Sequence, residues 1–140
     1  MKKTLPVLLI SFSNITFAGQ WVCISKSSTG YAEHSWEPKT FNFERKFEIK
    51  PLHLEPFFSR KWIDHETFGK ATHGIFISGE DTPHLPCFNL KNRIRCQKAL
   101  DSFDLNKKSK HFIYSSIPAT VDFETYGDNA FIEVGSCSKN

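Results

Sequence analysis

The alternation of apolar and polar residues between positions 40 and 51 is the feature that most limits how this chain can fold. Apolar side chains stand at every second position except Arg45, and Asn, Glu or Lys fill the positions between them. The apolar residues are Phe41, Phe43, Phe47 and Ile49. A period of two puts these two sets on opposite faces of a β-strand. One apolar and one solvated face are typical of an antiparallel sheet, because parallel strands are covered on both sides.

The first 18 residues have the features of a secretory signal peptide. Lys2 and Lys3 precede an apolar run over 5–10, and the small residues Thr16 and Ala18 stand just before Gly19. The run is shorter than the roughly 20 apolar residues that span a bilayer, so we expect cleavage after Ala18 and no integral membrane segment. The expected organisation is a leader over 1–18 and a single disulfide-stapled β domain over 19–140, either periplasmic or secreted.

The charge of the mature chain argues against nucleic-acid binding. The sequence has 18 Lys and Arg against 15 Asp and Glu, but two of the lysines belong to the leader, which leaves 16 against 15. Nucleic-acid binding requires clustered positive charge. The one basic run, over 107–110, lies between the apolar segments 103–105 and 112–114, and we interpret it as a solvated hairpin tip.

Four cysteines, an even number in an exported chain, predict two disulfides. The segment from Cys87 to Cys96 is symmetric about its two central residues, Lys91 and Asn92. A two-residue turn there would place the two cysteines opposite each other in a non-hydrogen-bonded pair, close enough for a disulfide. Cys23 then pairs with Cys137 and joins the first strand to the last. The sequence has no Cys-x-x-Cys pair, so we expect no zinc site.

Turn-forming residues divide the rest of the chain into short strands. The expected strands cover 20–25, 74–79, 85–98 as a hairpin, 103–105 with 112–114, and 130–137, with a loop at 27–31 and a turn at 126–129. Between 57 and 68 a short helix and a strand are both compatible with the pattern, and we favour a strand or an irregular turn of helix. The predicted fold class is mainly β, an antiparallel small barrel or sandwich of about 7–9 strands with at most one short helix.

The Gly19-Gln20-Trp21 segment that opens the mature chain resembles the Gly-x-Trp of lipocalins and of some small bacterial barrel inhibitors of proteases. The resemblance covers three residues at the start of the first expected strand. We carry no function over from it. By its residue type, Trp21 is expected to be a core aromatic at one end of a sheet.

The polar residues do not form a recognisable catalytic motif. Six histidines are present, but His65 and Glu66 lack the second histidine of the His-Glu-x-x-His zinc motif, because Gly69 stands in its place. No serine lies in Gly-x-Ser-x-Gly. We therefore expect no metal and no cofactor. The nearest group for an acid-base enzyme is His65, Glu66 and Arg60.

Arg45 interrupts the apolar face of the long strand. It is either a charge inside a cavity, paired with a ligand or with a buried Asp or Glu, or a bulge or rim residue whose guanidinium reaches solvent. We favour the second interpretation.

The function that we expect is an exported, non-catalytic binding protein of a bacterial envelope, of the protein-interaction, inhibitor or immunity type. Its partner is expected to be a protein, bound through an apolar patch over 52–58. The candidate binding residues are Leu52, Leu54, Phe57, Phe58 and Arg45. Two alternatives stay open: a small secreted hydrolase or nuclease that uses His and Glu, and a barrel carrier of a small apolar ligand.

Overall fold

The computed structural model describes residues 19–31, 37–41, 44–117 and 130–140. The expected leader and the expected turn at 126–129 lie outside these ranges. The elements are β1 (Trp21–Tyr31), β2 (Pro38–Phe41), β3 (Lys46–Pro51), α1 (Arg60–Ile63), β4 (Asp64–His65), β5 (Gly69–Lys70), β6 (His73–Ile77), β7 (Leu85–Asn89), β8 (Arg93–Lys98), β9 (Asp101–Asn106), β10 (His111–Ser116) and β11 (Ala130–Lys139).

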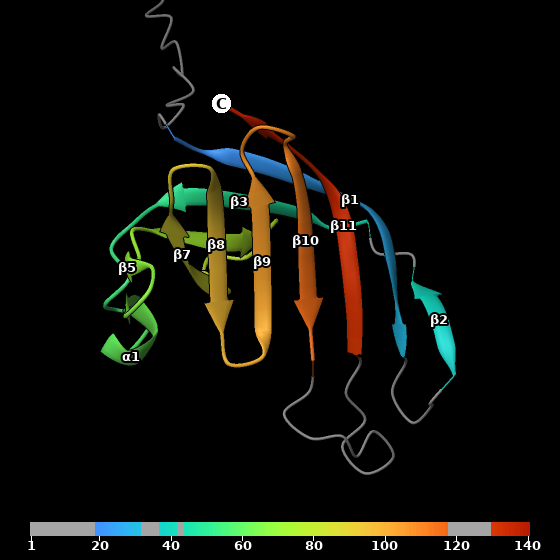
Figure 1. Ribbon diagram of the computed structural model, residues 1–140, viewed down its shortest axis with the longest axis horizontal. Helices are drawn as coiled ribbons and strands as arrows, with labels where there is room; N and C mark the ends of the chain where they lie inside the picture. The colour runs from blue at the N-terminus through green and yellow to red at the C-terminus, as the bar shows by residue number, and fades with distance from the viewer. Residues whose placement is uncertain (1–18, 32–36, 42–43, 118–129) are drawn as a thin grey trace, which may run out of the picture.

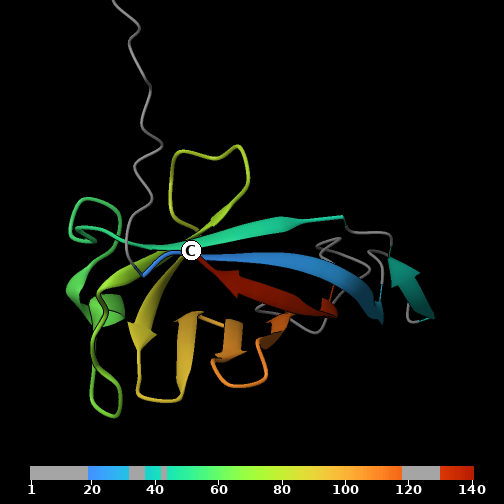
Figure 2. The same ribbon diagram turned by 90° about the horizontal axis from the view of Figure 1, so that it is seen from above.

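Eight of the strands form a closed antiparallel barrel (Figure 1). In the order β1-β3-β6-β7-β8-β9-β10-β11 each strand pairs with the next, and β11 pairs back with β1 from Trp21 to Tyr31. Seen from above, β3, β1 and β11 form a wall opposite β7 to β10 (Figure 2). The structure confirms the predicted class of mainly antiparallel β with two disulfides and one short helix, and it is a barrel rather than a sandwich.

The strand predicted over 40–51 is present as two strands along one line beside β1. β3 pairs with the first half of β1, and β2 pairs with its second half as an additional strand of the sheet. Phe47 and Ile49 are buried in the barrel, because every second residue of β3 points inward. The period of two therefore predicts the inward face of β3 correctly, while Phe43 lies outside the described residues.

The barrel interior is filled by aromatic rings. The ring of Phe47 lies 5.7 Å, centroid to centroid, from the rings of Phe103, Phe112 and Tyr114. Phe103 and Phe112 stack at 4.8 Å, and all four residues are buried. An eight-stranded barrel is just wide enough for inward side chains to fill it, and large rings at four positions account for much of that volume.

Both predicted disulfides are confirmed. Cys87 lies directly opposite Cys96 in the β7–β8 hairpin, with Cα atoms 4.0 Å apart, a short separation as expected for a non-hydrogen-bonded pair. Cys23 lies opposite Cys137 in the β1–β11 pairing. This second disulfide covalently joins the two strands whose pairing closes the barrel.

The loop expected at 27–31 is wrong, because these residues continue β1. All five pair with β11, and the last four, from Ser28 to Tyr31, also pair with β2 on the other side. Gly30 was a turn signal in the sequence, but here it permits a close approach of strands, since a Cβ on Gly30 would lie 2.0 Å from the carbonyl oxygen of Ala130. Glycine inside a strand often marks such an approach.

A second, smaller core lies on the outer side of β7. Phe88 points away from the barrel interior and is covered by the segment between β3 and β6, where Leu54, Phe58, Ile63 and Ala71 pack with it. Between 57 and 68 both expected alternatives occur, as the four-residue helix α1 and the two-residue strand β4. The segment after β3 therefore packs as an apolar cover over one wall of the barrel.

Candidate functional site

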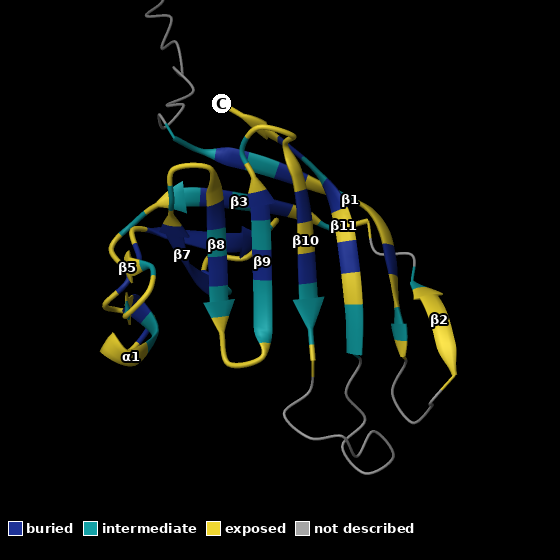
Figure 3. Cartoon of the chain, viewed as in Figure 1, coloured by how far each residue is buried: buried dark blue, intermediate teal, exposed yellow. Residues whose placement is uncertain are grey.

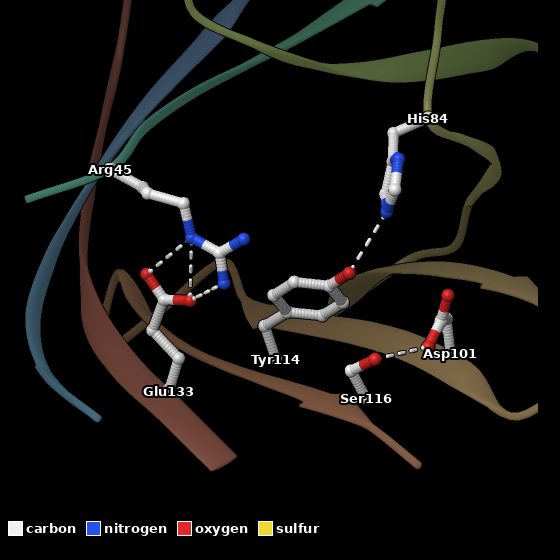
Figure 4. A network of polar contacts seen from close by, with 6 residues as sticks. All are labelled: Arg45, His84, Asp101, Tyr114, Ser116 and Glu133. Atoms are coloured by element: carbon white, nitrogen blue, oxygen red, sulfur yellow. Dashed lines mark hydrogen bonds and ion pairs between the residues drawn. The ribbon is translucent and has the colours of Figure 1, made fainter. Parts of the chain in front are cut away.

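Three interacting pairs of polar side chains lie close to one another at the end of the barrel where β9 begins and β10 ends (Figure 4). The pairs are Arg45 with Glu133, His84 with Tyr114, and Asp101 with Ser116. The last two pairs are hydrogen bonds of 3.0 Å and 2.7 Å. We call this set the polar end of the barrel.

The ion pair of Arg45 with Glu133 joins positions 88 residues apart in the sequence. Nε of Arg45 lies 3.1 Å from Oε2 of Glu133, and the Nη2 group also donates to this carboxylate. Glu133 is fully buried, and the guanidinium lies 5.0 to 5.5 Å from the ring centroids of Phe131, Tyr114 and Phe47, within the range of cation–π attraction. The structure confirms the pairing of Arg45 with a buried acid, the interpretation that we did not favour, while the Arg45 side chain keeps an exposed fraction of 25%.

Tyr114 is the most strongly shifted titratable group of the polar end. Burial raises the pKa of its phenol to about 12, the negative charge of Asp101 adds to the rise, and the positive charge of Arg45 opposes it. Its hydroxyl shares a hydrogen bond of 3.0 Å with Nε2 of His84. A phenol held neutral in this way acts as a hydrogen-bonding group of the barrel end rather than as an acid near neutral pH.

We expect an ultraviolet titration of the folded protein to show one tyrosine that ionises near pH 12. The pKa of Tyr114 is raised above the unfolded value of about 10, so its contribution to stability is complete below about pH 10 and is lost as the pH rises through about 12. Tyr114→Phe should remove this ionisation and cost about 1 kcal/mol of unfolding free energy through the lost hydrogen bond. An ionisation that persists in the folded variant would contradict the assignment.

The outer wall of β1, β10 and β11 carries a cluster of exposed branched aliphatic side chains, which we call the isoleucine face. Its members are Ile24, Ile113, Ile132 and Val134. Ile113 lies opposite Val134 across β10 and β11, and Ile132 lies opposite Ser115 and Thr29. Exposed and buried bands alternate along β11 in Figure 3, and the exposed ones include Ile132, whose exposed fraction is 54%.

A groove of about 590 Å³ adjoins the isoleucine face and shares Ile132 with it. Tyr31 and Pro38 contribute from β1 and β2, and Ile117 contributes from the end of β10. No Asp, Glu, Lys or Arg is among the described residues that line it. Together, the face and the groove form an apolar surface of the kind that marks interaction sites on soluble proteins.

The structure places the sequence-predicted binding residues in several different environments. Leu54 and Phe58 are 2% and 8% exposed and belong to the small core over β7, with Leu52 packed against it. Phe57 is 43% exposed, so the expected apolar patch over 52–58 is reduced to one side chain. Leu54 and Phe58 are buried because Phe88 points out of the barrel, and they pack against its ring. A binding role for Phe57 stays a prediction.

His65 and His73 have separate partners next to them in the sequence. Nδ1 of His65 accepts the backbone N–H of Thr67 at 3.1 Å, and His73 is buried with its Nδ1 2.7 Å from the hydroxyl of Thr72. Burial lowers the pKa of His73. Within the described ranges, no hydrogen bond or ion pair joins His65 to Glu66 or Arg60, and no group of His, Cys, Asp or Glu is placed to hold a metal ion. The acid-base enzyme gains no geometric support from these residues.

Sequence reasoning missed the isoleucine face, although β11 carries a signal for it. Cys137 lies in the barrel core with Cys23, so every second residue before it, including Glu133 and Phe131, also points inward. Ile132 and Val134 then point outward, where branched aliphatic residues have no core to join. Once one cysteine of a strand is known to point inward, the alternation along that strand therefore shows which of its residues point outward.

Searches against protein-family models, curated proteins and solved structures find no match to this chain. Among the described residues, no helix is long and apolar enough to cross a membrane.

Proposed function

We propose that this is an exported, non-catalytic binding protein of a bacterial envelope that recognises another protein through the isoleucine face and the adjoining groove. The observation that carries the proposal is the exposure of Ile24, Ile113, Ile132 and Val134 on three adjacent strands. Within β1, β10 and β11 their neighbours Ser115, Thr29 and Ser136 are small and uncharged, whereas Lys46 and Asp104 lie opposite Ile24 and Ile113 on the flanking strands. We therefore expect a partner surface that is apolar at its centre and charged only at its edges, with one side chain seated in the groove as an anchor.

The interior of the barrel favours this proposal over the carrier. A carrier needs an apolar cavity of about 300 Å³ or more, whereas the rings of Phe47, Phe103, Phe112 and Tyr114 occupy the middle of this barrel in mutual contact. The binding surface that we propose lies outside the barrel.

The two disulfides are consistent with an oxidising, exported location. We propose that the segment 1–18 directs this export and that the mature protein acts in the periplasm or after secretion. A rigid barrel closed by a disulfide suits a binding module, because the β1–β11 wall that carries the isoleucine face is held in place before the partner arrives.

The test is the affinity of the oxidised mature protein for a partner that is captured from an envelope extract and then purified. We expect Ile113→Ser/Ile132→Ser to raise the Kd at least about tenfold, because two exposed apolar contacts are lost. The stability of this variant should change by less than about 1 kcal/mol, since both side chains are more than half exposed. Isothermal titration calorimetry and urea unfolding measure the two quantities.

Two control variants distinguish this surface from others. Leu100→Ser removes an exposed apolar side chain of similar exposure from the turn between β8 and β9, and it should leave the Kd unchanged. Phe57→Ser tests the segment that the sequence pointed to. A Kd that responds to Phe57→Ser and not to the isoleucine variant would refute the proposed surface and restore the one predicted from sequence.

A further inference from the structure

Two hairpin turns that are separate in the sequence meet at the end of the barrel opposite the polar end. The turn of β7 and β8 contains Lys91 and Asn92, and the turn of β9 and β10 begins at Lys107; both lie at the top of Figure 1. The backbone N–H of Lys107 donates to the carbonyl oxygen of Asn92 at 3.0 Å, and its ammonium group donates to the carbonyl oxygen of Leu90. These bonds hold the turns together, and we call the pair the joined tips.

The joined tips border an open hollow of about 520 Å³ whose described lining residues are all Lys or Asn. The lining residues are Lys91, Asn92, Asn106, Lys107 and Lys108. Oδ1 of Asn106 already accepts the backbone N–H groups of Lys108 and Ser109, at 2.9 and 3.0 Å. Its side-chain NH₂ group, which can only donate, is therefore the part of the amide left for a ligand. The hollow is thus lined by the exposed Lys91 and Lys108 and by the amide of Asn106, while the ammonium group of Lys107 is engaged with Leu90.

The positive charge of the joined tips is not balanced by nearby acids. In the described part of the chain no carboxylate lies within ion-pair distance of Lys91, Lys107 or Lys108. Lys107 has a lowered pKa because of burial and then because of the charge of Lys139 on β11. The acids nearest in sequence are engaged elsewhere, since Asp104 binds Arg93 and Arg95. An anion bound here would be attracted by the lysines of both turns.

We infer that the joined tips are a binding site for a phosphate-bearing anion. Phosphate offers several acceptor oxygens and up to two negative charges, which matches separate ammonium groups and amide donors arranged around a hollow. Lysine binds phosphate as a point charge, so lysines on two turns can each meet a different oxygen of the tetrahedral group. The hollow is open to solvent and has room for a pyrophosphate or a phosphorylated headgroup as well as for inorganic phosphate. This site lies on a different part of the barrel from the isoleucine face, so it is independent of the protein-binding proposal.

The experiment is a titration of the ¹⁵N-labelled mature protein with pyrophosphate, followed by NMR. We expect saturable shifts of the backbone amides of Lys91, Asn92, Lys107 and Lys108, together with weakening of the affinity by added salt. Lys91→Gln/Lys108→Gln should weaken binding at least about tenfold, because two charge-assisted hydrogen bonds are lost. Lys107 is left in place because it holds the two turns together.

A matched variant, Lys26→Gln/Lys39→Gln, removes two exposed lysines from β1 and β2 and should keep the wild-type affinity. A second arm measures flotation with phosphatidylcholine vesicles, with and without phosphatidylglycerol. Binding to phosphatidylglycerol vesicles that is lost in Lys91→Gln/Lys108→Gln, without binding of pyrophosphate, would assign the site to a lipid headgroup. The inference would be overturned if Lys91→Gln/Lys108→Gln and Lys26→Gln/Lys39→Gln lost the same affinity. It would also be overturned if neither pyrophosphate nor phosphatidylglycerol vesicles bound to the protein.

Discussion

Replacing Arg45 with Met should lower the free energy of unfolding by about 3 kcal/mol, because the fully buried carboxylate of Glu133 then has no positive partner. The loss also includes the attraction of the guanidinium to the rings of Phe131, Tyr114 and Phe47. Met has a similar length and keeps most of the apolar packing. The loss of unfolding free energy therefore measures the removal of the positive charge. Urea unfolding at neutral pH measures it.

The double variant Arg45→Met/Glu133→Met tests whether the loss of stability comes from the unpaired charge of Glu133 rather than from altered packing. Because two apolar side chains can replace a buried ion pair without large cost, this variant should recover most of the loss. Arg95→Met provides a comparison at an ion pair with more exposed partners, 3.1 Å from Asp104, and should cost less than about 1 kcal/mol. If Arg45→Met is no more destabilising than Arg95→Met, Glu133 does not depend on Arg45 in the way we describe.

Removal of the disulfide between Cys23 and Cys137 should cost about 4 to 5 kcal/mol, the larger of the two disulfide effects. The two cysteines are 114 residues apart in the sequence, and the entropy that a crosslink removes from the unfolded chain increases with the length of the loop it closes. We expect Cys23→Ala/Cys137→Ala to be partly unfolded at 37 °C, a common result for small exported domains. Circular dichroism during thermal unfolding measures the change.

The disulfide of the β7–β8 hairpin is the internal comparison. Its cysteines are only 9 residues apart, so Cys87→Ala/Cys96→Ala should cost about 2 to 3 kcal/mol in the same entropy model. The difference of roughly 2 kcal/mol between the pairs is the result to measure. If the hairpin variant were the less stable of the two, loop entropy would not govern the contribution of the disulfides.

Local patterns in the sequence were sufficient for the elements whose partners are close in the chain. The symmetric segment between Cys87 and Cys96 predicts its own hairpin register, because counting outward from a two-residue turn fixes which residues face each other. Phe47 and Ile49 of β3 are inward as their alternation predicts. Both inferences need only the period of a strand and the length of a turn, which are local properties of the backbone.

The loop predicted at 27–31 shows where local signals were misleading. Ser, Thr and Gly are turn formers, but their place in β1 is decided by the close approach of β11, which a side chain on Gly30 would prevent. The same applies to Leu54 and Phe58, which the sequence presents as an apolar patch and the structure buries against Phe88. In each case the deciding contact comes from a distant part of the chain.

By itself the sequence determined the antiparallel β class, the pairing of the cysteines and the inward face of β3. Only the tertiary structure decided that the strands close into a barrel, that Arg45 meets Glu133, that isoleucines gather on one outer wall, and that Lys107 meets Asn92. The physical reason is that a strand's period and a turn's length are fixed by neighbouring residues. Contacts between distant strands depend on the register and closure of the whole barrel, which leave no periodic signal in the chain.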